Sequence, residues 1–218
     1  MTFIFLLCIL CCSMVGCLGH EPKKGVDPSQ NIERSCEESL QREQSLGKLQ
    51  SQFALKPDEF VIIIDISEQK LRLIKDEKIV KIYPVSTSKY GVDNKKDSNK
   101  TPLGIHRIAK KIGEDAPIGA IFESRIDTGK IAKIYTDKTE IQEDLMTTRI
   151  MWLEGLETGV NKGNGIDSYE RCIYIHGTQE EGLIGKPASH GCVRMKNKDV
   201  VELFNLVKMG TLVEIQES

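Results

Sequence analysis

The distribution of apolar residues predicts a series of short strands. Residues 60–66 form a β-branched run of strand length, too short for a typical helix. Residues 71–73 and 79–82 continue in the same style around the turn residues Asp76 and Glu77, which indicates a hairpin. Further strand-like segments lie at 83–88, 104–109, 118–122, 149–153, 171–176 and 211–215. We therefore expect a mainly β domain over residues 58–218, built as a sandwich or barrel.

One helix is predicted between residues 197 and 210. Asn197 is a candidate cap for its start, and Gly210 is a candidate stop. Apolar residues recur between them at helical spacing: Val200, Leu203, Phe204 and Val207. The domain is expected to contain one or two short helices.

The N-terminal residues predict export. No charged side chain occurs from Thr2 to Gly19, and the apolar run is shorter than the roughly 20 residues of a spanning helix. This pattern indicates an export signal over residues 1–19. Residues 14–17 resemble a bacterial lipobox that would lipidate Cys17, and ordinary cleavage after Gly19 is the alternative. Polar residues 20–57 predict a tether with a short helix, so the domain would work outside the cytoplasmic membrane, at its outer face or in the periplasm.

Charge and cysteine content narrow the classes of function. Thirty basic and 32 acidic residues give a net charge of −2, which argues against a nucleic-acid-binding face. Four of the seven cysteines fall in the export segment, so only Cys36, Cys172 and Cys192 lie beyond it. A bridge between Cys36 and Cys172 stays open. An odd number of cysteines in an oxidising compartment suggests that one is kept for chemistry.

Cys192 and His176 are the candidate nucleophile and base. A thiol attacks as the thiolate and needs a base nearby, and the histidine pKa near 6.5 suits that role. A strand over residues 171–176 would place Cys172, Tyr174 and His176 on one face. Gly177 and Gly191 reduce the bulk beside the two groups and let backbone N–H groups approach an oxyanion.

The same residues carry a family resemblance. His176-Gly177-Thr178, followed by Ser189-His190-Gly191-Cys192-Val193-Arg194, resembles the signature of the L,D-transpeptidase catalytic domain (YkuD type). Residues 101–104, Thr-Pro-Leu-Gly, resemble a second element of that family. The likeness spans about residues 60–215 and implies an L,D-transpeptidase-like β-sandwich or barrel.

The resemblance also implies roles for individual residues. Cys192 would be the nucleophile and His176 the base, with the Gly177 carbonyl orienting the imidazole. Backbone N–H groups at Gly191 and Cys192 would form the oxyanion hole. The remaining residues would shape the site: Ser189 and His190 around the nucleophile, Tyr174 lining the pocket and Arg194 meeting a substrate carboxylate. Residues 147–159, with Trp152, would form a lobe over the cleft.

The implied reaction is peptidoglycan L,D-transpeptidation. Cys192 would attack the bond between meso-diaminopimelate and D-alanine in a tetrapeptide stem, and a diaminopimelate amine would resolve the thioester as a 3→3 cross-link. Donor and acceptor stems would be the partners, with the membrane reached through the N-terminal signal or lipid anchor. No cofactor is expected.

Other functions remain open on the sequence alone. The same thioester would serve an L,D-carboxypeptidase, a lipoprotein-linking or -cleaving enzyme, or an exchanger of terminal D-amino acids. A non-catalytic wall-binding lipoprotein would use an inactive fold. A zinc site built from His176, His190 and Cys192 is the chemical rival, but no Cys-x-x-Cys or Glu-x-x-His spacing involves these three residues.

Overall fold

The computed structural model describes residues 47, 49, 51–53, 56 and 58–217. The predicted export signal, Cys17 and Cys36 lie outside the described residues. Within this part of the chain, no helix has the length and apolar character needed to cross a membrane. The elements follow in the order β1 (Val61–Asp65), β2 (Lys70–Lys75), β3 (Lys78–Ser86), β4 (Gly104–Ile112), β5 (Ala120–Glu123), β6 (Ile126–Ile131), β7 (Met146–Gly155), β8 (Tyr174–Thr178), the 3-10 turn η1 (Glu181–Leu183), β9 (Val193–Met195), α2 (Asn197–Leu206) and β10 (Leu212–Gln216).

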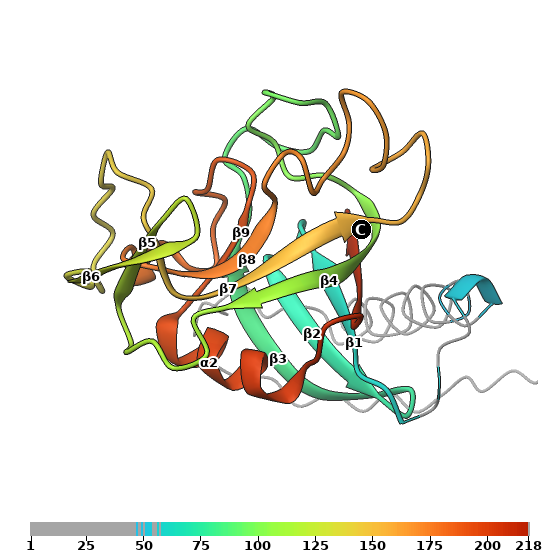
Figure 1. The fold of residues 1–218 in the computed structure, drawn as a ribbon, viewed down its shortest axis with the longest axis horizontal. Helices are drawn as coiled ribbons and strands as arrows, with labels where there is room; N and C mark the ends of the chain where they lie inside the picture. Colours follow the sequence, from blue (N-terminus) through green and yellow to red (C-terminus); the bar gives the residue numbers. More distant parts are fainter. Residues whose placement is uncertain (1–46, 48, 50, 54–55, 57, 218) are drawn as a thin grey trace, which may run out of the picture. The chain divides into compact units, whose positions relative to one another are not determined.

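The strands form one sheet that closes on itself, which confirms the predicted mainly β class. Their order is β4-β10-β1-β2-β3-β9-β8-β7-β5-β6, and β4 also pairs with β7. This extra pairing closes the strands from β4 to β7 into a barrel and leaves the β5–β6 hairpin on the outside (Figure 1). Neighbours are antiparallel except at two places, β1–β10 and β8–β9.

Apolar residues fill the barrel and also cover parts of its outer surface. The main cluster takes alternate residues of the barrel strands, among them Ile62, Ile175 and Val193. A second cluster lies on the other face of β1 and includes Val61 and Ile63. Both faces of β1 are therefore buried, which explains why its sequence is an unbroken apolar run and not an alternating one. The second cluster also includes Leu49, which is fully buried. Leu49 and residues 51–53 are helical.

Helix α2 occupies the predicted position, but its start is built differently. The helix contributes Val200, Leu203 and Phe204 to the main cluster and runs along the lower side of the strands in Figure 1. Lys196 is the N-cap residue, and its side chain makes no capping hydrogen bond. Asn197, the expected cap, is the first helical residue and is buried, because its side chain bonds to neighbouring strands and to η1.

Most predicted strands are present, with three differences. Strands β6 and β9 were not anticipated. β8 begins at Tyr174 and not at 171, because Cys172 has a left-handed φ of 58° and ends the preceding turn. The expectation that Cys172 shares a strand face with Tyr174 and His176 is therefore wrong.

Candidate active site

The register of β8 and β9 places the predicted nucleophile and base on one face of the sheet. The strands are parallel, with Ile175 opposite Val193 and His176 opposite Arg194. Cys192 immediately precedes this ladder and thus lies beside Tyr174, one diagonal step from His176. Side chains that lie side by side in a sheet point to the same face. Ile175 and Val193 point into the barrel core, so His176 and Cys192 point outward, away from it.

The His176 ring has a defined proton arrangement. Its Nδ1 lies 2.7 Å from the Gly177 carbonyl oxygen, the contact that the family resemblance implied. A carbonyl only accepts, so Nδ1 carries the proton and Nε2 of the neutral ring is left with a lone pair. Burial lowers the pKa of His176, and the opposing attraction of Asp144 is the smaller effect. The imidazole is therefore neutral near pH 7, with an atom ready to accept a proton.

The Cys192 thiol is protonated at rest. Burial raises its pKa to about 12, although the Tyr174 backbone N–H opposes that effect. The thiol also donates to the Cys172 carbonyl at 3.5 Å. The residue as a whole is half-buried and so keeps some access to solvent. The pair is consequently a neutral thiol and a neutral imidazole, with proton transfer left to the moment of attack.

Glycines at 177 and 191 are required for different reasons. A Cβ at Gly177 would lie 2.6 Å from Asn197 Oδ1 and 2.7 Å from the Thr147 carbonyl, so the backbone packs too closely for a side chain. Gly191 has a φ of 126°, a conformation that L side chains rarely adopt. Glycine at these two positions therefore allows the backbone conformation that holds His176 and Cys192 in place.

Ser189 closes the turn before the nucleophile. Its buried hydroxyl donates to the Cys192 carbonyl at 2.6 Å and accepts the Gly191 N–H at 3.2 Å. The Gly191 N–H, which was expected to face an oxyanion, therefore points to Ser189 in this structure.

Thr101, from the upstream Thr-Pro-Leu-Gly element, holds this turn from the other side. Its hydroxyl donates to the Gly191 carbonyl at 3.0 Å and accepts the Ser88 N–H at 3.0 Å. Arg171 fixes the same upstream loop by donating to the carbonyls of Asp93 and Lys100. The sequence analysis assigned no role to either side chain.

Arg194 lies in a buried ion-pair network. One terminal nitrogen is 2.6 Å from Asp144 Oδ1 and the other is 2.7 Å from Glu180 Oε2, and the side chain is 2% exposed. Its two terminal nitrogens are thus engaged inside the protein, where a substrate carboxylate does not reach. The expected contact with substrate is corrected on this ground, and Asp144 and Glu180 are site residues that the sequence analysis missed.

His190 lies on the rim of the site. Its Nδ1 is 3.0 Å from Asp144 Oδ2, and its ring lies 5.7 Å from that of Tyr90. Burial alone would raise the pKa of Asp144, but the Arg194 cation outweighs burial and holds that pKa below its usual value. His190 also lines a polar cavity of about 150 Å³ together with Lys96, Asp97, Asn99, Glu170, Arg171 and Ile173.

An aromatic cluster covers the outer face beside Cys192. Tyr174 meets Trp152 edge-on at 5.5 Å, and Phe122 of β5 joins the same cluster, against which Cys192 packs. Burial raises the pKa of Tyr174, so its hydroxyl stays protonated. The expected lobe over residues 147–159 is wrong, because most of that segment is barrel strand β7. The β5–β6 hairpin instead extends the sheet beyond the barrel, where β5 pairs with the first residues of β7.

Comparisons with known proteins identify the family of the domain. The family model of the L,D-transpeptidase catalytic domain matches residues 59–215. YkuD of Bacillus subtilis (strain 168) is 56% identical over 41 residues, covering 19% of this chain and 25% of that protein. YbiS of Escherichia coli (strain K12) is 28% identical over 115 residues, covering 52% and 36%. Both relatives are named as L,D-transpeptidases, and the chain spans about a quarter to a third of their lengths.

A solved structure of an L,D-transpeptidase from Mycobacterium smegmatis aligns with a TM-score of 0.43 and 16% identity, covering 72% of this chain and 58% of that one. The family model accounts for most of the chain, from the start of β1 to the last strand. The chain belongs to the L,D-transpeptidase catalytic domain family.

Proposed function

We propose that the protein is a cysteine acyltransferase that acts on peptidoglycan stem peptides as an L,D-transpeptidase. The observation that supports this most directly is the pairing of Cys192 and His176 on one sheet face, with the imidazole held in the tautomer that leaves Nε2 free to accept a proton. Family membership supplies the substrate class.

The geometry suggests the following order of events. As the Cys192 sulfur attacks the carbonyl between diaminopimelate and D-alanine, its proton passes to His176 Nε2. The carbon–nitrogen bond breaks, and His176 returns the proton to the departing D-alanine amine. The resulting thioester is then attacked by a diaminopimelate amine of a second stem, which releases the Cys192 thiol and forms a 3→3 cross-link.

The raised pKa of Cys192 and the lowered pKa of His176 support proton transfer during attack over a preformed thiolate–imidazolium pair. Burial penalises both charged forms, so the ion pair is costly until a substrate carbonyl is present to take the sulfur's charge. Export through residues 1–19, with or without lipid on Cys17, would place the enzyme at its substrate.

The test uses the purified full-length chain and muropeptides with tetrapeptide stems, analysed by mass spectrometry. We expect loss of D-alanine together with a cross-linked dimer. Loss without a dimer would assign the carboxypeptidase alternative, and retention of D-alanine would support a non-catalytic wall-binding role. Cys192→Ala should abolish every product, whereas Cys172→Ser is the matched control, because it keeps the backbone carbonyl that accepts the Cys192 thiol and a side-chain acceptor for Arg125.

A further inference from the structure

We propose that Arg125, at the tip of the β5–β6 hairpin, binds the free carboxylate of the residue that leaves when Cys192 is acylated. The inference rests on the proposed function and adds to it a residue that selects the donor peptide. It replaces Arg194 as the cation that meets substrate.

The position of Arg125 is the first argument. Its Nη1 lies 3.1 Å from the Tyr174 hydroxyl and 3.6 Å from Cys172 Sγ. Tyr174 is beside Cys192 in the β8–β9 register, and the Cys172 carbonyl is 3.5 Å from the nucleophilic sulfur. The guanidinium therefore contacts two residues that themselves border Cys192. A carboxylate one residue beyond the attacked carbonyl lies within a few ångströms of it, so a cation on the residues that border Cys192 is placed to meet that carboxylate.

The conformation of the hairpin tip is the second argument. Ser124 and Arg125 have φ values of 47° and 71°, in the left-handed region that Gly and Asn normally occupy in such turns. Two side chains with Cβ atoms in this region carry a conformational cost. The guanidinium also stacks over the Trp152 ring at 4.7 Å, which aims it at the outer face of β7 and β8.

The state of the other arginines near the site is the third argument. Arg194 is held by Asp144 and Glu180. Arg171 donates from both terminal nitrogens to the loop over residues 93–100, and Arg149 is buried against Phe204, with its Nη1 bound to two backbone carbonyls. Among the described residues, Arg125 contacts its partners, Tyr174 and Cys172, through Nη1. Its Nε and Nη2 remain available for a forked contact with a carboxylate.

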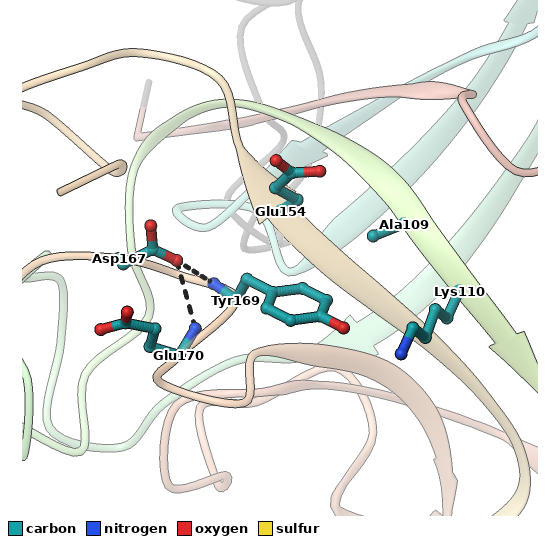
Figure 2. A pocket seen from close by; sticks show the side chains of 6 residues that line it. All are labelled: Ala109, Lys110, Glu154, Asp167, Tyr169 and Glu170. Carbon is teal, nitrogen blue, oxygen red and sulfur yellow. Dashed lines mark hydrogen bonds between the residues drawn. The ribbon is translucent and has the colours of Figure 1, made fainter.

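The neighbouring groove does not compete for the carboxylate. Tyr169 stacks on Trp152 at 4.0 Å and leads from Arg125 into a groove of about 410 Å³. Figure 2 shows its lining, which holds the ammonium of Lys110 and the carboxylates of Glu154, Asp167 and Glu170. Glu154 is already paired with Arg107 and Lys162, and the one cation in the lining is Lys110, a point charge, so a forked contact with a carboxylate is available at Arg125 and not in this groove.

The test compares two donor tetrapeptides, one with a free C-terminal carboxylate and one with a C-terminal carboxamide, by their rates of Cys192 acylation. We expect the wild type to prefer the carboxylate by about 10- to 100-fold in kcat/KM, the range for a charge-assisted contact. Arg125→Gln should remove this preference by slowing the carboxylate donor alone, and Arg125→Lys should restore part of it. Arg107→Gln, at an arginine paired with Glu154 on the surface, is the matched control and should keep the preference.

The outcomes separate the inference from the proposed function. Equal rates of the wild type with the two donors would overturn the role of Arg125 while leaving the acyltransferase intact. An equal loss on both donors in Arg125→Gln would also overturn it, because that result describes a merely structural hairpin contact. A wild type that is acylated by neither donor refutes the proposed function, and the inference fails with it.

Discussion

Replacing Arg194 with Met should be one of the most destabilising single changes in the domain. Methionine keeps much of the apolar stem but removes the guanidinium that neutralises Asp144 and Glu180. The Glu180 side chain is 4% exposed and that of Arg194 is 2% exposed, so water does not reach the abandoned Glu180 carboxylate readily. A buried charge without its partner keeps its desolvation cost and loses the attraction that offset it.

The expected loss is about 3 to 5 kcal/mol in the free energy of unfolding, the range for breaking a buried ion pair from one side. Total stabilities of native domains are about 5 to 15 kcal/mol, so Arg194→Met should shift the unfolding midpoint far to lower urea. The matched control is Lys81→Met. Lys81 pairs with Glu202 at 2.7 Å, but these side chains are 47% and 44% exposed, and the loss should stay within about 0.2 to 1 kcal/mol.

Urea unfolding followed by tryptophan fluorescence suits this comparison, because Trp152 is the single tryptophan of the chain and packs beside Tyr174. The difference between wild type and Arg194→Met should also narrow toward pH 4. Arg194 holds the pKa of Asp144 low, and without Arg194 the Asp144 carboxylate protonates at higher pH, which relieves part of the unpaired charge. A loss no larger than that of Lys81→Met would refute the idea that burial, and not the ion-pair distance, sets the energy of this network.

Three further predictions follow from groups around the site. The pH profile of kcat/KM should rise with pH through a midpoint below 6.5 and then level off, because the lowered pKa of His176 makes its neutral form the base; a midpoint above 6.5 would contradict this. His106 is fully buried, and burial lowers its pKa to about 4, so between pH 6.5 and 4 a proton binds His106 in the unfolded chain but not in the folded one. The free energy of unfolding should therefore fall by up to roughly 3 kcal/mol as the pH drops from 6.5 to 4. His106→Gln should reduce this pH dependence in urea titrations, and an unchanged dependence would exclude His106 as its cause. Thr101→Val should lower kcat by roughly 10-fold or more, because it removes the hydroxyl that bonds to the Gly191 carbonyl and the Ser88 N–H, while Thr101→Ser should stay near wild type. Equal activities of the Val and Ser variants would assign Thr101 to packing alone.

Longer strands with buried residues were predictable, whereas the exposed β6 and the three-residue β9, although buried, were not. β1 and β10 gave strong signals because their side chains are almost all buried, so apolar residues accumulate in them. β6 is exposed along nearly its whole length, and the side chains of Ile126 and Ile131 are 71% and 57% exposed. Its sequence therefore lacks the alternation of apolar and polar residues that identifies a half-buried strand. Asn197 fitted the composition of a helix cap, but the same polar side chain also suits a buried junction, and only the fold distinguishes the two uses.

The two central site residues followed from a local motif, whereas their surroundings depend on distant parts of the chain. The expected Gly177 carbonyl contact needs only the next residue, and it is present. Asp144 and Arg125 come from the segment between β5 and β7, which shows no motif, and they reach the site because the hairpin and the following loop fold over the barrel. The wrong assignment for Arg194 has the same origin, since its partners are not adjacent to it in sequence.

The parallel pairing of β8 and β9 explains why the site exists at this place. A tight hairpin after β8 would make the next strand antiparallel to β8. The residue that precedes that strand would then lie beside the C-terminal end of β8 and not beside Tyr174. The parallel arrangement requires a crossover over residues 179–192, and the end of β3 holds it: the Gly185 N–H donates to the Val85 carbonyl and the Ser189 N–H to the Thr87 carbonyl, each at 2.9 Å. The crossover delivers Cys192 at the start of β9, in line with Tyr174 and on the face of His176. The hydrogen bonds of an otherwise structural strand thus determine where the nucleophile stands, and changes at the end of β3 should affect catalysis as well as stability.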